Sequence, residues 1–225
     1  MQPYAVMLPP PDSIFERFTR GEGIALLKRV ERFARKSHRS EDAITNTSYD
    51  KLLRSIVLKH GDWSVTEYAG VSVELLFDRG ISHEFVRHRL QALTQESTRF
   101  VNYEKKIPPS FIYPFDDDAH DEAIDPDWMD AIEPCESAYK KLIQKGWRPQ
   151  RARSVLPHAL STGLISTMNL RMWRHLFLMR TTRETHPQMR RVAIPLLREF
   201  QATIPILYED IVPMARQADN LRMGK

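Results

Sequence analysis

The feature that most constrains the fold of this chain is the change in its hydrophobic period. Residues 22–36 and 48–60 repeat apolar side chains at helical spacing, whereas apolar and polar residues alternate from Val71 until Leu76 breaks the pattern before Phe77. The alternation predicts a half-buried strand of an antiparallel sheet. Helical spacing then returns over residues 81–91. Helix and strand patterns therefore follow one another without a βαβ repeat.

The second half of the chain continues this mixed order. Its patterns predict a loop-rich segment at 92–125 with a short strand at Phe111–Phe115, a helix from Asp125-Pro126 to Gly146, a short helix at 149–156, a strand at 159–168, and helices at 170–180 and 187–202. We therefore expect an α+β fold, with one domain over residues 1–225 and a mostly antiparallel sheet flanked by helices.

Glycine is scarce, with eight residues in the chain, and this excludes two classes of nucleotide-binding protein. Gly21 and Gly23 are followed by Leu26, where a dinucleotide-binding fingerprint needs a third glycine, and no P-loop motif occurs. An anionic ligand must therefore be held by side chains, for which arginine is suited. Cys135 is the only cysteine, so no internal disulfide can form, and no spacing of possible ligands indicates a metal site.

The charge balance is mildly basic: 33 Lys plus Arg against 29 Asp plus Glu give a net charge of +4. The basic residues are mostly arginines in short clusters, without a basic tail or a lysine-rich run, so nucleic acid is not the expected partner. No stretch approaches the roughly 20 apolar residues of a membrane span. The start of the chain does not resemble an export signal, so we expect a cytoplasmic protein.

Two arginine clusters are the candidate ligand-binding residues. Arg87 and Arg89 flank His88 near the end of the helix expected at 81–91, where two positions along the helix turn the side chains about 200° apart. In the helix expected at 170–180, Arg171, Arg174 and His175 share a face, and Arg180 falls about 180° from Arg171. Taken alone, the first cluster indicates a site that could bind phosphates, and we expect some arginines of the second helix to meet internal or bound anions.

The same residues carry a family resemblance. Arg87-His88-Arg89 followed by seven residues and Ser97 is similar to the RHR-x7-S signature of flavin-dependent thymidylate synthases. The similarity continues in order through Thr94–Phe100, Ala152–Pro157, Met168–Arg171 and Leu178–Thr181, and it covers roughly residues 24–212.

The resemblance implies reductive methylation of dUMP to dTMP, with methylenetetrahydrofolate as one-carbon donor, FAD as hydride carrier and NADPH as reductant. It also implies a homotetramer with FAD where subunits meet, and Arg180 as the catalytic residue that favours ionisation at uracil N3. The residues that resemble the FAD-contacting set are Ser64, Arg87, His88, Arg89, Gln95, Asn169, Arg171 and His175. Those that resemble the dUMP-contacting set are Glu84, Phe85, Val86, Arg87, Gln95, Glu96, Ser97, Thr98, Arg99, Arg153 and Arg180.

Two alternatives remain open at the level of sequence. Asp62 and Tyr68 stand where many relatives have histidine, so a flavin-dependent pyrimidine nucleotide hydroxymethylase of the same fold is one alternative product class. A non-enzymatic nucleic-acid-binding protein that uses the same arginines is the other, and it predicts affinity that falls steeply with salt.

Overall fold

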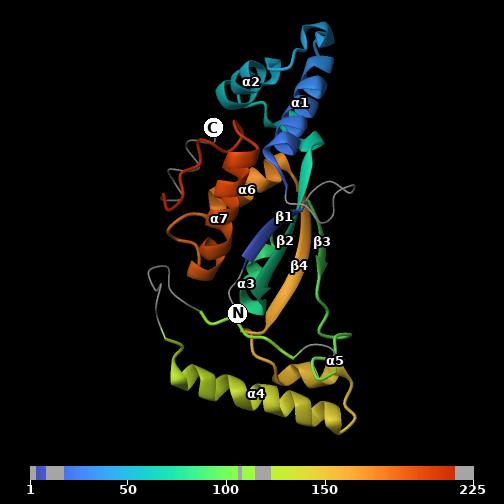
Figure 1. Cartoon of the computed structure of the whole chain (residues 1–225), viewed down its shortest axis with the longest axis vertical. Coiled ribbons are helices and arrows are strands. Elements are labelled where there is room, and N and C mark those ends of the chain that lie inside the picture. Colours follow the sequence, from blue (N-terminus) through green and yellow to red (C-terminus); the bar gives the residue numbers. More distant parts are fainter. Residues whose placement is uncertain (1–3, 9–17, 106–107, 115–122, 216–225) are drawn as a thin grey trace.

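The computed structural model describes residues 4–8, 18–105, 108–114 and 123–215. Helices outnumber strands in it (Figure 1). The α-helices are α1 (Arg20–Lys36), α2 (Ser48–Leu53), α3 (Arg79–Phe85), α4 (Pro126–Gln144), α5 (Pro149–Ala152), α6 (Leu170–Arg180) and α7 (Pro187–Thr203). A π-helix, η3 (Arg54–Lys59), continues α2, and short 3₁₀ helices are η2 (Glu41–Ala43), η4 (Trp63–Tyr68) and η5 (Arg153–Val155).

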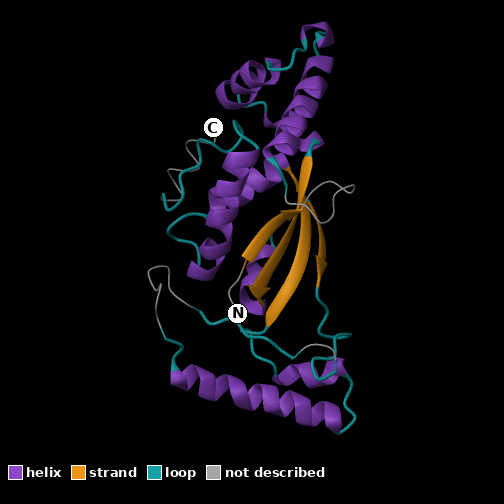
Figure 2. Ribbon diagram, viewed as in Figure 1, coloured by secondary structure: helices purple, strands orange, loops and turns teal. Residues whose placement is uncertain are grey.

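Four strands form one antiparallel sheet in the order β1-β2-β4-β3. The strands are β1 (Tyr4–Leu8), β2 (Gly70–Asp78), β3 (Gln91–Gln95) and β4 (Ser161–Asn169). Helices α6 and α7 lie along one side of this sheet, α1 and α2 lie near one of its ends, and α4 and α5 lie near the other (Figure 2). The expected α+β class with an antiparallel sheet is therefore confirmed.

The alternating pattern of β2 determines which face of the sheet is buried. Val71, Val73, Leu75 and Phe77 are all at most 3% exposed, and they belong to the main core together with Trp173 of α6 and residues of α7. The partners of β2 on β4 alternate in the same way, because directly opposed residues of an antiparallel pair point to the same face. A smaller second core lies under α4 and α5.

Helix α1 begins with a capping box. The backbone N–H of Glu22 donates to Oγ1 of Thr19 at 3.3 Å, and the Glu22 carboxylate accepts from the backbone N–H of Thr19. Gly23, one turn further on, is buried against the end of α7. A Cβ atom built there would stand 1.8 Å from the carbonyl oxygen of Thr203, so only glycine permits this approach of the two helices.

The expected helix over 81–91 is wrong in its second half. Helix α3 ends at Phe85, and the backbone N–H groups of Arg87 and His88 bond to carbonyls only three residues back, as in a closing turn. Leu90 then takes a φ of 63°, and the chain continues as β3. Segment 92–125 therefore begins with a strand where we expected a loop. Strand pairing with β4, which lies some 70 residues away in sequence, outweighed the local helical pattern.

Three further differences concern short segments. The strand β1 was not predicted, although Tyr4–Leu8 is a short apolar run, because its pairing with β2 joins segments about 70 residues apart. The strand expected at Phe111–Phe115 is reduced to one bridge between Phe111 and Leu160, and Phe115 lies outside the described residues. The helix expected at 48–60 is α-helical only as far as Leu53 and continues as a π-helix. The helices beginning at Pro126, Leu170 and Pro187 are confirmed.

Candidate functional site

The site forms where two chain connections meet. Strand β4 passes directly into α6, whose N-cap is Asn169: its Oδ1 accepts a hydrogen bond from the backbone N–H of Met172 at 2.8 Å. Strand β3 pairs with β4 so that Gln91 lies opposite Met168. The turn that carries Arg87-His88-Arg89 is therefore held beside α6.

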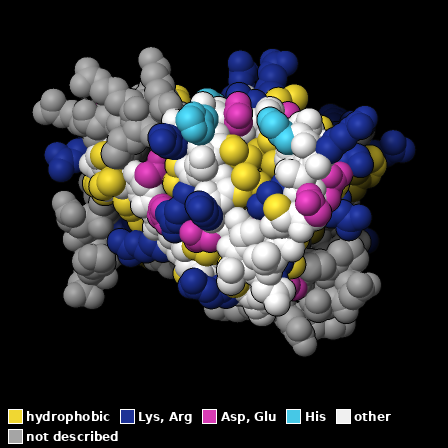
Figure 3. Space-filling view, turned by 90° about the horizontal axis from the view of Figure 1, so that it is seen from above, with side chains coloured by type: hydrophobic (Ala, Val, Ile, Leu, Met, Phe, Trp, Pro, Cys, Tyr) yellow, Lys and Arg dark blue, Asp and Glu magenta, His cyan; other side chains and the backbone are white. Residues whose placement is uncertain are grey.

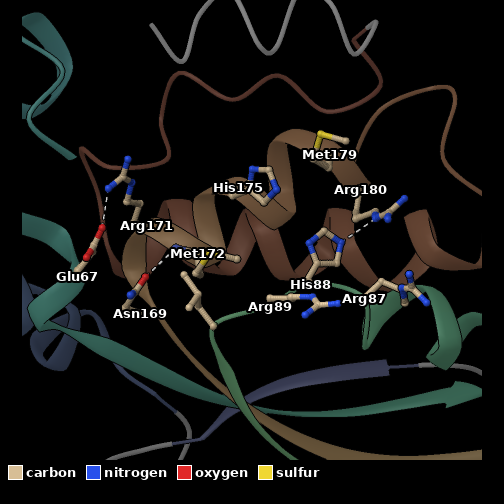
Figure 4. A pocket seen from close by; sticks show the side chains of 11 residues that line it. Glu67, Arg87, His88, Arg89, Asn169, Arg171, Met172, His175, Met179 and Arg180 are labelled. Carbon is tan, nitrogen blue, oxygen red and sulfur yellow. Dashed lines mark hydrogen bonds and ion pairs between the residues drawn. The ribbon is translucent and has the colours of Figure 1, made fainter. Parts of the chain in front are cut away.

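A cavity of about 670 Å³ opens between this turn and α6 (Figure 4). Among the side chains that line it are six of the eight that resemble the FAD-contacting set: Arg87, His88, Arg89, Asn169, Arg171 and His175. Arg180 lines it as well. Residues more than 80 positions apart in sequence are thus brought to one cavity by a single strand pairing.

Four further residues that were not predicted from the sequence also line the cavity: Glu67, Leu90, Met172 and Met179. Glu67 accepts a hydrogen bond from Arg171 at 2.5 Å, so this arginine is already paired with an anion in the chain. The side chains of Leu90, Met172 and Met179 add apolar surface. An exposed glutamate and three ordinary apolar residues carry no signal in a single sequence that would mark them as site residues.

Ser64 and Gln95 of the expected FAD set do not line the cavity. Ser64 lies on η4, three residues before Glu67, and residues at this spacing in a 3₁₀ helix stand on one side of it. Ser64 is therefore next to the wall of the cavity. Gln95 is turned away, because its side-chain amide donates to Oγ of Ser82 at 3.0 Å and to Oγ1 of Thr162 at 3.3 Å.

Arg180 is held at the end of α6 by two partners. Its Nε–H donates to Nε2 of His88 at 2.8 Å, and its terminal N–H bonds to the carboxylate of Glu84. His88 is buried, and its ring lies 5.9 Å from the ring of His175, measured between centroids. Burial, together with the charge of Arg180, lowers the pKa of His88 from 6.5 to about 4.

The remaining polar residues that resemble the dUMP-contacting set form a second group at the far end of β3. Arg153 donates to Oγ1 of Thr98 at 2.9 Å, and Oγ of Ser97 accepts from the backbone N–H of Arg99 at 3.3 Å. Glu96 accepts from the hydroxyl of Tyr103 at 2.6 Å. Desolvation and this carboxylate raise the pKa of Tyr103, so its hydroxyl stays protonated and remains a donor.

The two groups are separated along the sheet. Strand β3 runs from Gln91 to Gln95, four steps of about 3.3 Å or roughly 13 Å, between the cavity and the group that contains Arg153. Phe85 belongs to neither group, since it is 1% exposed and packs in the main core. Val86, half-buried at the C-cap of α3, does not line the cavity either.

The expected opposition of arginines along two helices is not what the structure shows. Arg87 and Arg89 lie beyond the end of α3, so helical phase does not orient them. Arg171 and Arg180 are out of phase on α6 yet line the same cavity, toward its two ends (Figure 4). Arg174 does not line the cavity with Arg171 and His175, whose face we expected it to share. It is buried and forms two bonds with Asp210 at 2.6 and 2.5 Å, so it meets an internal anion.

The surface and the described side chains give three further findings. On the face seen in Figure 3, lysines and arginines alternate with acidic side chains and do not form one continuous strip. Within the ranges described above, no three His, Cys, Asp or Glu side chains are grouped so that they could hold a metal ion. No helix in those ranges is long and apolar enough to cross a membrane.

The fold and site together define an α+β protein with a cavity whose arginine side chains suit anionic ligands, in place of a glycine loop. The family described as "Thymidylate synthase complementing protein" matches residues 25–206, and the chain belongs to this family. This confirms the family resemblance seen in the sequence.

Two relatives agree with this membership, and a solved structure shares the fold. A flavin-dependent thymidylate synthase of Mycobacterium sp. (strain JLS) is 33% identical over 233 residues, which cover 92% of this chain and 87% of the relative. The enzyme of the same name from Sulfurisphaera tokodaii is 30% identical, covering 84% of this chain and 72% of the relative. The crystal structure of flavin-dependent thymidylate synthase ThyX from Helicobacter pylori, complexed with FAD and dUMP, superposes with a TM-score of 0.68 at 17% identity, covering 94% of this chain and all of that one.

The lining of the cavity fits a flavin dinucleotide. Arg87, Arg89 and Arg171 supply the cationic donors that a pyrophosphate needs without a glycine-rich loop. Leu90, Met172 and Met179 offer the apolar contact that a planar ring system needs. These residues therefore suit both parts of FAD.

Proposed function

We propose that this chain catalyses the reductive methylation of dUMP to dTMP, with methylenetetrahydrofolate as one-carbon donor, FAD as hydride carrier and NADPH as reductant. The observation that carries the proposal is the placement of Arg180. Its guanidinium is held by Glu84 and His88 at the end of the same cavity that Arg87, Arg89 and Arg171 line. Family membership and relatives named flavin-dependent thymidylate synthase support it.

The cofactor is held by Arg87, Arg89, Arg171 and Asn169, with Ser64 at the margin. When bound, FAD supplies the hydride that completes the methyl group. Arg171 is paired with Glu67 in the chain alone, so binding of a pyrophosphate exchanges one anionic partner of this arginine for another. His175 and His88 close the side of the cavity between Arg171 and Arg180.

Arg180 activates the pyrimidine. A guanidinium beside N3 and its neighbouring carbonyl stabilises the N3-deprotonated uracil, which raises the electron density at C5, where the one-carbon unit is attached. Because this charge grows toward the transition state, the interaction lowers the barrier more than it strengthens binding. Ser97, Arg99 and Arg153 hold the nucleotide phosphate, for which they provide a hydroxyl and two guanidinium groups.

No cysteine nucleophile takes part in this mechanism. Cys135 lies within α4, half-buried, and its thiol donates to the backbone carbonyl of Ala131 at 3.3 Å. Helix α4 packs on the second core and not on the cavity. The thiol is thus part of the packing of a helix, and the chemistry proceeds without a covalent bond between enzyme and nucleotide.

The active protein is a cytoplasmic homotetramer in this proposal. The dUMP set is divided between the two ends of β3, about 13 Å apart along the strand. A nucleotide that touches Arg180 and Arg153 at once is accommodated when the two groups come from neighbouring subunits, which meet around the flavin.

The test is the absorption spectrum and the product of the purified protein. We expect a yellow protein that releases FAD on denaturation and converts dUMP to dTMP when methylenetetrahydrofolate and NADPH are supplied. A colourless protein that does not take up added FAD would overturn the proposal. A hydroxymethyl pyrimidine nucleotide as product would favour the hydroxymethylase alternative instead. A protein without a chromophore that binds DNA with an affinity falling steeply with salt would favour the nucleic-acid alternative.

A further inference from the structure

In the hydrogen bond between Arg180 and His88, the arginine is the donor and the imidazole is the acceptor. Arg180 reaches out from the last turn of α6, and its Nε–H donates to Nε2 of His88 at 2.8 Å. A guanidinium carries only donors and does not lose a proton in proteins. Nε2 of His88 must therefore be the unprotonated, accepting nitrogen of the ring, and the ring proton must be on Nδ1.

The surroundings of His88 keep this ring uncharged. The side chain is 7% exposed, and the groups that face it are Arg180 and His175 from α6. Its sequence neighbours are Arg87 and Arg89, and the carboxylate of Glu84, four residues before it, is bonded to Arg180. A second positive charge on His88 would face the guanidinium directly, which agrees with a pKa lowered to about 4.

The two partners of Arg180 come from one short piece of chain. Glu84 lies in the last turn of α3, and His88 lies in the closing turn four residues later. The carboxylate accepts one N–H from Nη1 and the imidazole accepts the N–H of Nε, so two different edges of the planar guanidinium are fixed. Of its five N–H groups, three remain for other partners.

We propose that His88 is a positioning residue: its neutral, Nδ1-protonated imidazole, together with Glu84, holds the guanidinium of Arg180 in the one orientation that presents its remaining N–H groups to the pyrimidine ring of dUMP. This role is additional to any contact of His88 with FAD, and it rests on the proposed function. Its physical basis is preorganisation: a charge that is already oriented needs no rearrangement when the transition state forms.

The first experiment reads the ring directly and needs no turnover. The protein with ¹⁵N-labelled histidine is observed by NMR from pH 7.5 to 5, and the His88 signals are assigned with the His88→Gln variant. We expect protonated Nδ1 and unprotonated Nε2 throughout, and a change of tautomer populations in Arg180→Ala, where the donor is gone. A native ring protonated on Nε2, or charged at pH 7, would overturn the proposal.

The second experiment separates orientation from binding. In His88→Gln the side-chain carbonyl can still accept from Arg180, whereas in His88→Leu it cannot. With FAD content matched, we expect kcat within about tenfold of native for His88→Gln and lower by roughly 100-fold for His88→Leu, with the KM for dUMP changed far less. The matched control is His83→Leu, an exposed histidine of α3 outside the cavity, which should retain native kcat.

The outcomes distinguish the two proposals. Three results would contradict the positioning role in an enzyme that is otherwise active. They are an equal kcat in the native protein and in His88→Leu, equal losses of kcat in both His88 variants, and an effect on KM alone. A native protein that binds FAD but does not convert dUMP would overturn the proposed function, whereas the tautomer of His88 would still be decided by NMR.

Discussion

At the scale of single residues, the chemistry is concentrated on Arg180. We expect Arg180→Ala to keep its fold and its FAD but to lose nearly all dUMP-dependent oxidation of the flavin in the presence of methylenetetrahydrofolate. The reason is that the lost guanidinium stabilises charge that develops on the pyrimidine, and a single preorganised donor of this kind contributes about 3 kcal/mol, or roughly 100-fold in rate. Stopped-flow absorbance of the flavin measures this rate.

The matched control for Arg180→Ala is Cys135→Ala. This thiol lies in α4 and bonds only within its helix among the contacts described, so turnover should be near normal. If Cys135→Ala were inactive with flavin still bound while Arg180→Ala remained active, a mechanism with a cysteine nucleophile would replace the one proposed.

The buried imidazole of His88 makes stability depend on pH. Folding lowers its pKa from 6.5 to about 4, so between these values the unfolded chain binds more protons than the folded one. The stabilisation is complete above pH 6.5 and is lost as the pH falls toward 4, by at most about 3 kcal/mol. Urea unfolding at pH 7, 6 and 5 should show this decline in the native protein and a shallower one in His88→Gln. Identical declines in both proteins would contradict the assignment.

At the scale of elements, the contact of α1 with the end of α7 depends on Gly23. In Gly23→Ala, the added Cβ would stand 1.8 Å from the carbonyl oxygen of Thr203 and 2.6 Å from its carbon, so the helices must separate. We expect the free energy of unfolding to fall by about 2 kcal/mol. Chemical denaturation followed by circular dichroism measures this loss.

Gly21→Ala is the control for this prediction, because both glycines lie in the first turns of α1. The nearest atom to a Cβ at Gly21 is Oγ1 of Thr19 at 3.7 Å, an ordinary contact. Alanine there should leave stability unchanged or raise it by about 0.5 kcal/mol, through its better helix propensity. If the two variants had equal free energies of unfolding, the close approach of the helices would not contribute to stability.

At the scale of the whole molecule, the division of the dUMP set predicts that one site uses two chains. Arg180→Ala and Arg153→Ala should each be inactive alone. In tetramers assembled at random from both variants, about a quarter of the sites would combine a native Arg180 with a native Arg153, so activity should reappear. Light scattering should report four chains of 26.3 kDa, and mass spectrometry should verify mixing. Mixed tetramers without activity, or an active monomer, would contradict the shared site.

The segments whose structure follows from local pattern were predicted well from the sequence. The alternation from Val71 to Phe77 became β2, and Asp125-Pro126 became the start of α4. These features depend on side-chain period and on capping, which act between residues close in sequence. Six of the eight residues that resemble the FAD-contacting set line one cavity, and they came from the family resemblance of short motifs. Their contact with FAD stays a prediction.

Only the tertiary structure decided the rest, since strand pairing and burial are interactions between distant residues. Pairing of β3 with β4 ended α3 at Phe85, so Arg87 and Arg89 lie in a turn and are not opposed on a helix. The same pairing brought Arg180 to His88, 92 positions away, and it set apart the group that contains Arg153. The scarcity of glycine predicted that a cofactor would be held by side chains, for which arginine is the natural candidate. Which arginines face the cavity was decided by the folded chain: Asp210 holds Arg174 inside the protein, whereas Glu67 holds Arg171, and Glu84 and His88 hold Arg180, at the cavity.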